Sequence, residues 1–253
     1  MQQSPFGETR TRVEFNHALV AEDGHVVSPL VGWNNAEGVV LISPAMSHGA
    51  ATPRFVQYLV NGSEACTTTG ADAPIERLVY VLEGDANLDG ETLPADSFAW
   101  FSPGDSYTLK LPAGARALVF EKNYEPLDGH NTPERVVGTL ATAPKDPFLG
   151  DPEAMLATLL PVEPSFDMAV NVFEYTPGTT LPFVETHVME HGLYMRSGQG
   201  VYRLGDCWYP VQQGDTIWMA SYCPQWFVAM GKESASYIYY KDIHRPLLTN
   251  PAS

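Results

Sequence analysis

The chain has 253 residues and a mass of 27.7 kDa, enough for one large domain or for two domains of about 125 residues. Its composition is 44% hydrophobic, 11% aromatic and 17% charged, which excludes a disordered, coiled-coil or collagen-like protein. The formal net charge is −16, from 14 Lys and Arg against 30 Asp and Glu. We therefore expect no nucleic-acid or membrane partner, because both need clustered basic residues.

The cysteines and the aliphatic runs indicate a cytoplasmic protein. The three cysteines, Cys66, Cys207 and Cys223, form no Cys-x-x-Cys pair, and their odd number argues against a disulfide framework. The first residues contain no apolar signal region, and the longest aliphatic run, Val39 to Ile42, is far shorter than a membrane span.

Short runs of Val, Tyr, Phe, Trp and Leu, separated by Gly and Pro, predict an all-β fold. In chain order, the clearest predicted strands are residues 78–82, 117–120, 169–173, 200–204, 216–219 and 236–240. One helix is predicted from Asp151 to Leu160, since Asp151 can cap it, Pro152 suits its first position and Pro161 stops it.

Two similar halves flank a stretch rich in Pro, Gly and charge. Residues 77–84 align with residues 191–198 at an offset of 114, and residues 118–122 align with residues 237–241 at an offset of 119. The same order of landmarks indicates a duplicated β unit rather than chance similarity. We predict an N-terminal barrel at residues 1–130, a linker with a short helix at residues 131–165 and a C-terminal barrel at residues 166–253.

The segment from Glu185 to His191 carries the strongest sign of chemistry. Glu185 and His187 lie two residues apart, so on a strand both side chains face the same side, and His191 follows past a bend. Two histidines and a carboxylate within seven residues predict a metal site more readily than ordinary polar residues at a strand end.

This segment resembles the first cupin motif, with Glu185 and His187 in its His-x-His positions and His191 in its Glu position. Gly178 precedes the segment and Gly198 closes it. The second cupin motif ends in a histidine, where this chain has Gln225 after the Gly214-Asp215 turn. The resemblance implies a bicupin, with two tandem jelly-roll barrels. Two nitrogen and two oxygen donors suit Mn(II) or Fe(II) better than zinc.

The first half keeps the barrel pattern but lacks the ligands. At the matched offsets, the ligand residues are replaced by Ala71, Ala73, Arg77 and Ser106. We predict one metal ion per chain, in the C-terminal barrel.

A narrower resemblance covers nearly the whole chain. Segments such as Val201-Tyr-Arg-Leu, Gly214-Asp-Thr-Ile-Trp-Met and Cys223-Pro-Gln-Trp are similar to the (S)-ureidoglycine aminohydrolase family, bicupins of purine (allantoin) catabolism once labelled glyoxylate-induced proteins. The resemblance implies a manganese-dependent hydrolase that converts (S)-ureidoglycine and water to (S)-ureidoglycolate and ammonia.

The residue roles that this resemblance implies fall into three sets. The implied metal ligands are Glu185, His187, His191 and Gln225. The implied contacts to the anionic ureide substrate are Glu185, Tyr202, Gln225, Tyr237 and Lys241. We assign the movement of the catalytic proton to Lys241 or Glu185 as a hypothesis.

Two other functions stay open, an Fe(II) cupin dioxygenase and a non-enzymatic bicupin that stores or senses a small molecule. Oxygen consumption separates the first from a hydrolase, and the second predicts eroded ligands in both barrels. Cupin barrels pair through exposed edge strands, so a homo-oligomer is expected. Cys223 shares strand parity with Gln225, but we expect no nucleophilic role for it.

Overall fold

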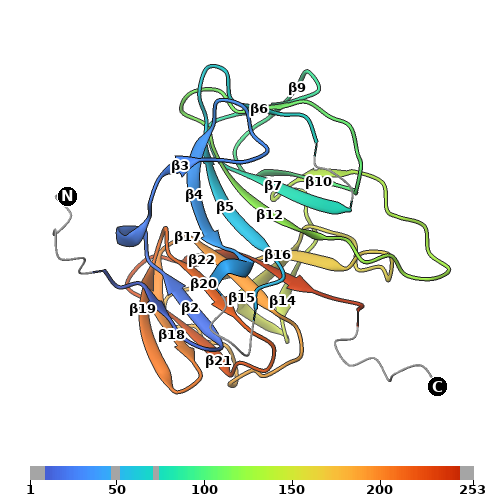
Figure 1. Cartoon of the computed structure of the whole chain (residues 1–253). Helices are drawn as coiled ribbons and strands as arrows, with labels where there is room; N and C mark the ends of the chain where they lie inside the picture. Colours follow the sequence, from blue (N-terminus) through green and yellow to red (C-terminus); the bar gives the residue numbers. More distant parts are fainter. Residues whose placement is uncertain (1–8, 47–51, 71–73, 246–253) are drawn as a thin grey trace.

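The computed structural model describes residues 9–46, 52–70 and 74–245, which are almost entirely β-structure. Two short 3-10 helices are present in these ranges, η1 (Glu22–Gly24) and η2 (Pro44–Met46). Two barrels lie side by side, each built from a large and a small sheet (Figure 1). No helix in the described part of the chain has the length and apolar character that crossing a membrane requires.

The first barrel combines a seven-stranded sheet, in the order β13-β10-β7-β12-β5-β4-β3, with a four-stranded sheet, in the order β6-β11-β8-β9. Its strands are β3 (Ser28–Pro29), β4 (Glu37–Ile42), β5 (Val56–Asn61), β6 (Thr67–Thr68), β7 (Ile75–Glu83), β8 (Ala86–Leu88), β9 (Glu91–Leu93), β10 (Ser97–Phe101), β11 (Leu109–Lys110), β12 (Arg116–Asn123) and β13 (Val136–Thr139).

The second barrel combines an eight-stranded sheet, in the order β1-β2-β20-β17-β22-β16-β15-β14, with a three-stranded sheet, in the order β19-β18-β21. Its strands are β1 (Arg12–Val13), β2 (His17–Val20), β14 (Lys145–Phe148), β15 (Asp151–Thr158), β16 (Met168–Tyr175), β17 (His191–Ser197), β18 (Gln199–Leu204), β19 (Cys207–Gln212), β20 (Thr216–Met219), β21 (Gln225–Met230) and β22 (Ala235–Asp242).

The sheets do not follow the predicted division of the chain. β1 and β2, from the N-terminal part, extend the sheet of the second barrel by pairing along β20, and Figure 1 shows β2 among the strands of that barrel. The predicted linker contains β13, which pairs with β10 of the first barrel, and also β14 and β15, which belong to the second. The N-terminal strands therefore cover an edge of β20 that would otherwise be unpaired.

The six predicted strands are present, and the helix prediction is wrong. Residues 151–158 form β15, which pairs with β14 on one side and β16 on the other. Asp151 and Pro152 sit at the beginning of the strand, where a missing N–H can be tolerated. Ala154 and Ala157 are buried while Asp151, Pro152 and Glu153 are exposed, so tertiary pairing outweighs the local signals for a helix.

The internal repeat is confirmed by the topology, but the predicted alignment of residues 118–122 with residues 237–241 is displaced by one residue. β7 lies between β10 and β12, as β17 lies between β20 and β22. Arg77 pairs with Glu121 across the first ladder, and His191 pairs with Lys241 across the second. The offset for the last strand is therefore 120 rather than 119, which matters because a shift of one residue moves every side chain to the opposite face.

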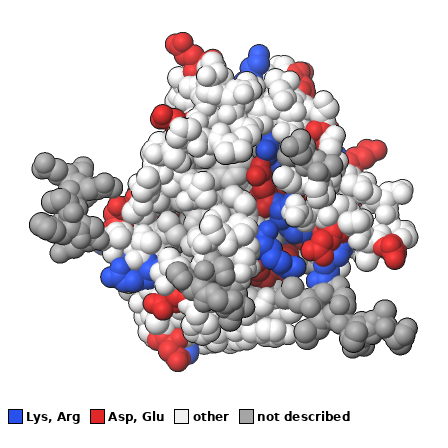
Figure 2. Space-filling model, viewed as in Figure 1, with Lys and Arg blue, Asp and Glu red and all other residues white. Residues whose placement is uncertain are grey.

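Alternation along the strands divides the core into three clusters. On β22, Tyr237 and Tyr239 pack inside the second barrel, whereas Ile238 and Tyr240 pack into a cluster that both barrels share. A third cluster fills the interior of the first barrel, with Val79 and Val119 among its members. The shared cluster makes the two barrels one packed body. On the face in Figure 2, basic and acidic side chains lie next to each other right of centre.

Candidate metal centre

The backbone brings Glu185 and Gln225 together at the rim of the second barrel. Glu185 N–H donates to the Gln225 carbonyl at 2.8 Å, and Gln225 N–H donates to the Glu185 carbonyl at 2.9 Å. Because directly opposed residues in an antiparallel pair project to the same face, both side chains can point into the barrel. Gln225 is 2% exposed and begins β21, whereas Glu185 lies in a segment outside the named strands that meets β21 at this bridge and at the Thr180–Val228 bridge.

His187 is held in one orientation by its neighbours. Its Nδ1 lies 3.1 Å from the Met189 carbonyl, which makes Nδ1 the donor and leaves Nε2 as an acceptor. Gln225 Nε2 lies 2.8 Å from His187 Nε2 and donates to it. The His187 carbonyl accepts a bond of 2.7 Å from the N–H of Tyr222, whose φ of +62° is unusual for a non-glycine residue.

His191 and Lys241 are opposite each other at the ends of β17 and β22. The rings of His191 and His187 lie with centroids 4.3 Å apart. His191 is buried, and its Nε2 has no hydrogen-bond partner among the described residues. A buried imidazole nitrogen without a partner is costly, so this atom suits a bound ion or ligand.

A cavity connects most of the predicted site residues. It encloses about 330 Å³ of unoccupied space, including the part open to solvent. Among the residues that line it, Lys241 is the one Lys or Arg. The lining residues are Phe148, Phe173, Leu181, Glu185, His191, Leu193, Tyr202, Gln225, Tyr237, Tyr239 and Lys241.

Aromatic side chains form the wall of this cavity and present hydroxyl groups to it. Tyr202 donates to Gln225 Oε1 at 3.3 Å, and the hydroxyls of Tyr237 and Tyr175 lie 3.0 Å apart. The Lys241 ammonium lies 5.4 Å from the ring centroid of Tyr239. Burial raises the pKa of Tyr202 and of Tyr237 above the ordinary phenol value, so both phenols remain protonated donors at neutral pH.

Burial also shifts the pKa values of four groups at this site in the direction that favours their neutral forms. These groups are Glu185, His187, His191 and Lys241. It lowers the pKa of His187 and, further, that of His191, with the positive charge of Lys241 acting in the same direction. Burial raises the pKa of Glu185 and lowers that of Lys241, and each of these shifts is opposed by the charge of the other group. Both histidines are therefore neutral at physiological pH, as metal ligation requires.

The predicted donors, two imidazoles, an amide and a carboxylate, suit a divalent cation in their chemistry. Within the ranges described, no three His, Cys, Asp or Glu side chains approach closely enough to hold a metal by themselves. The two imidazoles and the Gln225 amide are gathered, and Glu185 lines the same cavity as His191 and Gln225. His187 does not line the cavity directly; it reaches it through Gln225.

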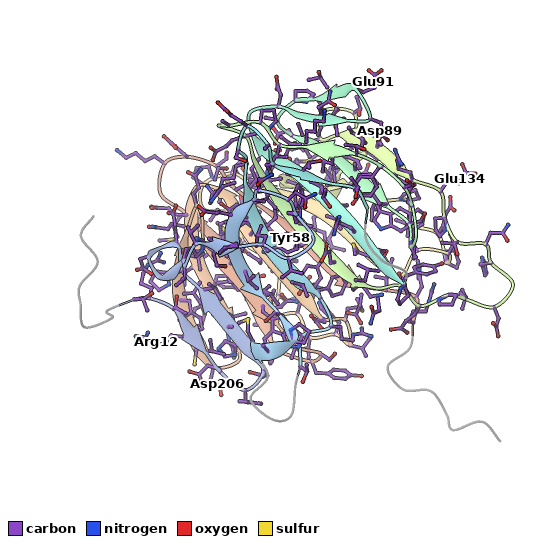
Figure 3. The ribbon with its side chains drawn as sticks, turned by 45° about the horizontal axis from the view of Figure 1, so that its top comes forward. Arg12, Tyr58, Asp89, Glu91, Glu134 and Asp206 are labelled. Carbon is purple, nitrogen blue, oxygen red and sulfur yellow. The ribbon has the colours of Figure 1, made fainter. Side chains whose placement is uncertain are left out.

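The interior of the first barrel is occupied by an ion pair. Arg77, in the position of His191, pairs with Glu121, which takes the position of Lys241. Tyr58 lies centrally on β5 (Figure 3) and donates to Glu121 at 2.8 Å, while Arg77 donates to Tyr107 at 2.6 Å. Arg77 thus stands where the second barrel has His191, and its charge is already paired.

The ladders also correct the expected counterpart of Gln225. Gln225 pairs with Leu204, which precedes a two-residue turn, and Leu109 pairs with Leu88, which precedes the equivalent turn. The counterpart is therefore the buried Leu109 and not the exposed Ser106, because the loops of the two repeats differ in length. Ala71 and Ala73 lie outside the described residues.

Several residues that line the cavity were missed in the sequence, and the two phenylalanines show why. Phe148 comes from β14, in the segment interpreted as a linker, where an aromatic residue among Pro and charged residues was the available signal. Phe173 was placed on a strand, but nothing in its spacing indicated a cavity. Cys223 is buried in the second barrel, and burial raises the pKa of its thiol to about 11. The three cysteines are all unpaired.

Comparison with known proteins finds relatives that are named as enzymes. The family model described as cupin domain matches residues 171–240. An (S)-ureidoglycine aminohydrolase from Arabidopsis thaliana is 40% identical over 94% of this chain and 80% of the relative. An (S)-ureidoglycine aminohydrolase from Escherichia coli (strain K12) is 34% identical over 91% of this chain and 89% of the relative.

A solved structure of similar length has the same architecture. The crystal structure of a putative glyoxylate-induced protein from Pseudomonas aeruginosa superimposes with a TM-score of 0.87. It is 26% identical in sequence, and the match covers 98% of this chain and 96% of that one. The tandem arrangement therefore holds over the whole length of both chains.

Proposed function

Because the chain belongs to the (S)-ureidoglycine aminohydrolase family, we propose that it hydrolyses (S)-ureidoglycine to (S)-ureidoglycolate and ammonia, in a small-molecule site inside the second barrel. It is an enzyme, and its relatives favour the hydrolase over the dioxygenase and the binding protein. The observation that carries the proposal for the site is the cavity that joins Glu185, His191, Gln225 and Lys241.

We propose that Mn²⁺ is the cofactor, one ion per chain, held by two imidazoles, an amide and a carboxylate. The ligands would be His187, His191, Gln225 and Glu185. When bound, the ion supplies a positive centre that orients and polarises a chelating substrate. The partnerless His191 Nε2 and the His187 tautomer support this assignment, because a histidine ligand donates its other N–H to an acceptor such as a backbone carbonyl.

Lys241 and the tyrosines would bind and orient the substrate. The substrate carries a carboxylate, an amine and a ureido group on one carbon. The ammonium of Lys241 attracts the carboxylate within a protein of net charge −16. The hydroxyls of Tyr202 and Tyr237 would contact the ureido group, and Phe148 and Phe173 would exclude water from one side.

Two ionisable groups of the cavity, Lys241 and Glu185, can move the protons that the reaction requires. Breaking the C–N bond leaves its electron pair on nitrogen, so the amine must gain a proton before ammonia departs. Lys241, whose pKa burial lowers, can give that proton. The C–O bond forms from water, and the Glu185 carboxylate, which lines the same cavity, can accept the proton that the water loses. General acid–base help of this kind is typically worth about 10²–10⁴-fold.

Elemental analysis of the purified protein, coupled to an ammonia-release assay with (S)-ureidoglycine, tests the proposal. We expect about one manganese per chain and ammonia release that stops on chelation and returns with Mn²⁺. Oxygen consumption without ammonia release would favour the dioxygenase instead. We also propose, from the sequence alone, that the protein is a cytoplasmic homo-oligomer.

A further inference from the structure

Arg54 of the first barrel lies directly behind the candidate site of the second. It precedes β5, and its backbone N–H donates to both carboxylate oxygens of Glu190, at 2.9 and 3.2 Å. Its guanidinium forms an ion pair with Asp242 and lies 3.9 Å from Glu190. Arg54 thus contacts Glu190 through its backbone and its side chain, and Asp242 through its side chain.

Glu190 and Asp242 are the chain neighbours of His191 and Lys241. His191 and Lys241 are paired across the β17–β22 ladder and line the cavity. Successive side chains of a strand point to opposite faces, so the two carboxylates lie on the other side of the same ladder. Asp242 also accepts a hydrogen bond from the Glu190 N–H. The contacts form a closed network behind the cavity, which we call the Arg54 clamp, made of Arg54, Glu190 and Asp242.

The two carboxylates of the clamp are deeply buried, whereas the Arg54 side chain is 28% exposed and also lies 3.8 Å from Glu125. Glu190 is 3% exposed and Asp242 5% exposed. Glu190 Oε1 also accepts bonds from the Trp218 indole at 3.2 Å and from the Tyr240 hydroxyl at 3.1 Å. Phe55, next to Arg54, stacks on Tyr240 with ring centroids 3.8 Å apart. Two buried carboxylates need a cation to stay in place, and the first barrel supplies it.

We infer that Arg54 is a positioning residue that acts through Glu190 and Asp242 to fix His191 and Lys241 in the cavity. This inference rests on the proposed function of the second barrel. It also gives the first barrel, whose own interior is filled by an ion pair, a role in the chemistry of the second. Outer partners that orient a ligand typically change metal affinity about 10- to 100-fold when removed.

The test compares Arg54→Met with a matched control, Arg196→Met. Arg196 lies on the same strand as His191, and it also joins the barrels through a partly buried ion pair, with Asp96. It contacts Ser236 near the opposite end of the β17–β22 ladder, away from the cavity. Both substitutions remove one guanidinium from the contact between the barrels, so both should lower the midpoint temperature of thermal unfolding.

The readouts are the Mn²⁺ dissociation constant, from the EPR signal of the free ion during titration, and the separate values of kcat and KM. Arg54→Met should weaken Mn²⁺ binding about 10- to 100-fold and lower kcat, whereas Arg196→Met should leave both within about twofold of the wild type. Unchanged Mn²⁺ affinity in Arg54→Met, or an equal loss in both variants, would overturn the inference.

A second variant keeps the test decisive if Arg54→Met does not fold. Asp242→Asn removes the charge that pairs with Arg54 but keeps the size of the side chain and an oxygen for the Glu190 N–H. The same loss of Mn²⁺ affinity is expected, and wild-type affinity would contradict the inference. The titration of the wild-type protein tests the proposed metal site separately. A wild-type protein that binds no Mn²⁺ would refute that site rather than the role of Arg54.

Discussion

Lys241 combines a buried ammonium with a position in the cavity wall, and it has no counterpart of the same charge in the first barrel. Glu121 takes its place there. Replacing Lys241 with Met keeps the length of the side chain and removes the charge and the proton. We expect ammonia release to fall about 10²–10⁴-fold while manganese stays near one per chain. Retained activity would remove Lys241 from the chemistry, and lost manganese would assign it a role in holding the ion.

His187 is the imidazole whose orientation the surrounding residues fix most clearly, through Met189 and Gln225. We expect His187→Ala to lose manganese, measured by elemental analysis after gel filtration, and to lose activity with it. His17→Ala is the control, because His17 is likewise hydrogen-bonded, to Asn16 and Tyr209, and lies buried outside the cavity. Full manganese content in the His187 variant would contradict the ligand set.

For individual residues, the sequence predicted which side chains could form a site, but not all of the contacts that hold them. The spacing of Glu185, His187 and His191 was enough to indicate a metal site, whereas Gln225 entered only through the family resemblance. Arg54 could not be found, because its contacts with Glu190 and Asp242 span 136 residues or more along the chain. Side chains that depend on the packing of two barrels leave no local pattern.

Among the elements, β15 shows why local signals failed. Asp151, Pro152 and Pro161 are typical of a helix, yet the segment pairs with β14 and β16 along its length. Strand formation depends on neighbours that are distant in sequence, so the propensity of a short isolated segment is a weak guide. The apolar runs that became β7, β12 and β22 were predicted correctly because burial on both faces keeps them hydrophobic.

The attachment of β1 and β2 to the second barrel should contribute to the stability of the protein. Arg10, just before β1, donates two bonds to Asp215, at 2.7 and 2.8 Å, and Asp215 is fully buried beside β20. Arg10→Met leaves that carboxylate with only backbone donors, from Gln212 and Glu22. We expect the free energy of unfolding to fall by about 1–3 kcal/mol, measured by urea denaturation.

Arg12→Met is the control for that measurement. Arg12 is exposed and donates only to the carbonyls of Thr9 and Thr11, so its loss should change the free energy of unfolding by less than about 0.5 kcal/mol. Equal effects of the two substitutions would show that the Arg10–Asp215 contact does not hold the N-terminal strands to the second barrel.

Over the whole molecule, a buried ion cluster joins the barrels and should make stability depend on pH. Lys122 contacts Glu76 and Asp167, and all three residues are buried. Burial, followed by the neighbouring Asp167, raises the pKa of Glu76 well above its ordinary value. The folded protein therefore keeps a proton that the unfolded chain releases, so the free energy of unfolding should fall as pH rises through the range above the ordinary glutamate pKa.

Glu76→Gln removes this dependence, because Gln can accept the Trp100 indole bond that Glu76 accepts at 2.9 Å and has no proton to lose. We expect the variant to gain stability relative to the wild type as the pH rises above the ordinary glutamate pKa. Glu83→Gln, at the exposed end of the same strand, should follow the wild-type curve. Parallel curves for all three proteins would refute the role assigned to Glu76.

The tandem architecture was predictable from the repeat and the family resemblance, but its exact division was not. The repeated order of landmarks identified two β units. The addition of β1 and β2 to the second barrel, and of β13 to the first, has no sequence signal, because a strand of two to four residues fits either barrel equally well by composition. The one-residue error in aligning the last strand has the same origin, since a bulge or a loop absorbs single insertions without altering the hydrophobic pattern.

Anomalous diffraction at the manganese edge, from crystals of the manganese-loaded protein, tests the central claim most directly. The account predicts one peak per chain, inside the second barrel, within bonding distance of Glu185, His187, His191 and Gln225. A peak in the first barrel, or one that the Glu185 carboxylate and the Gln225 oxygen do not both reach, would contradict it.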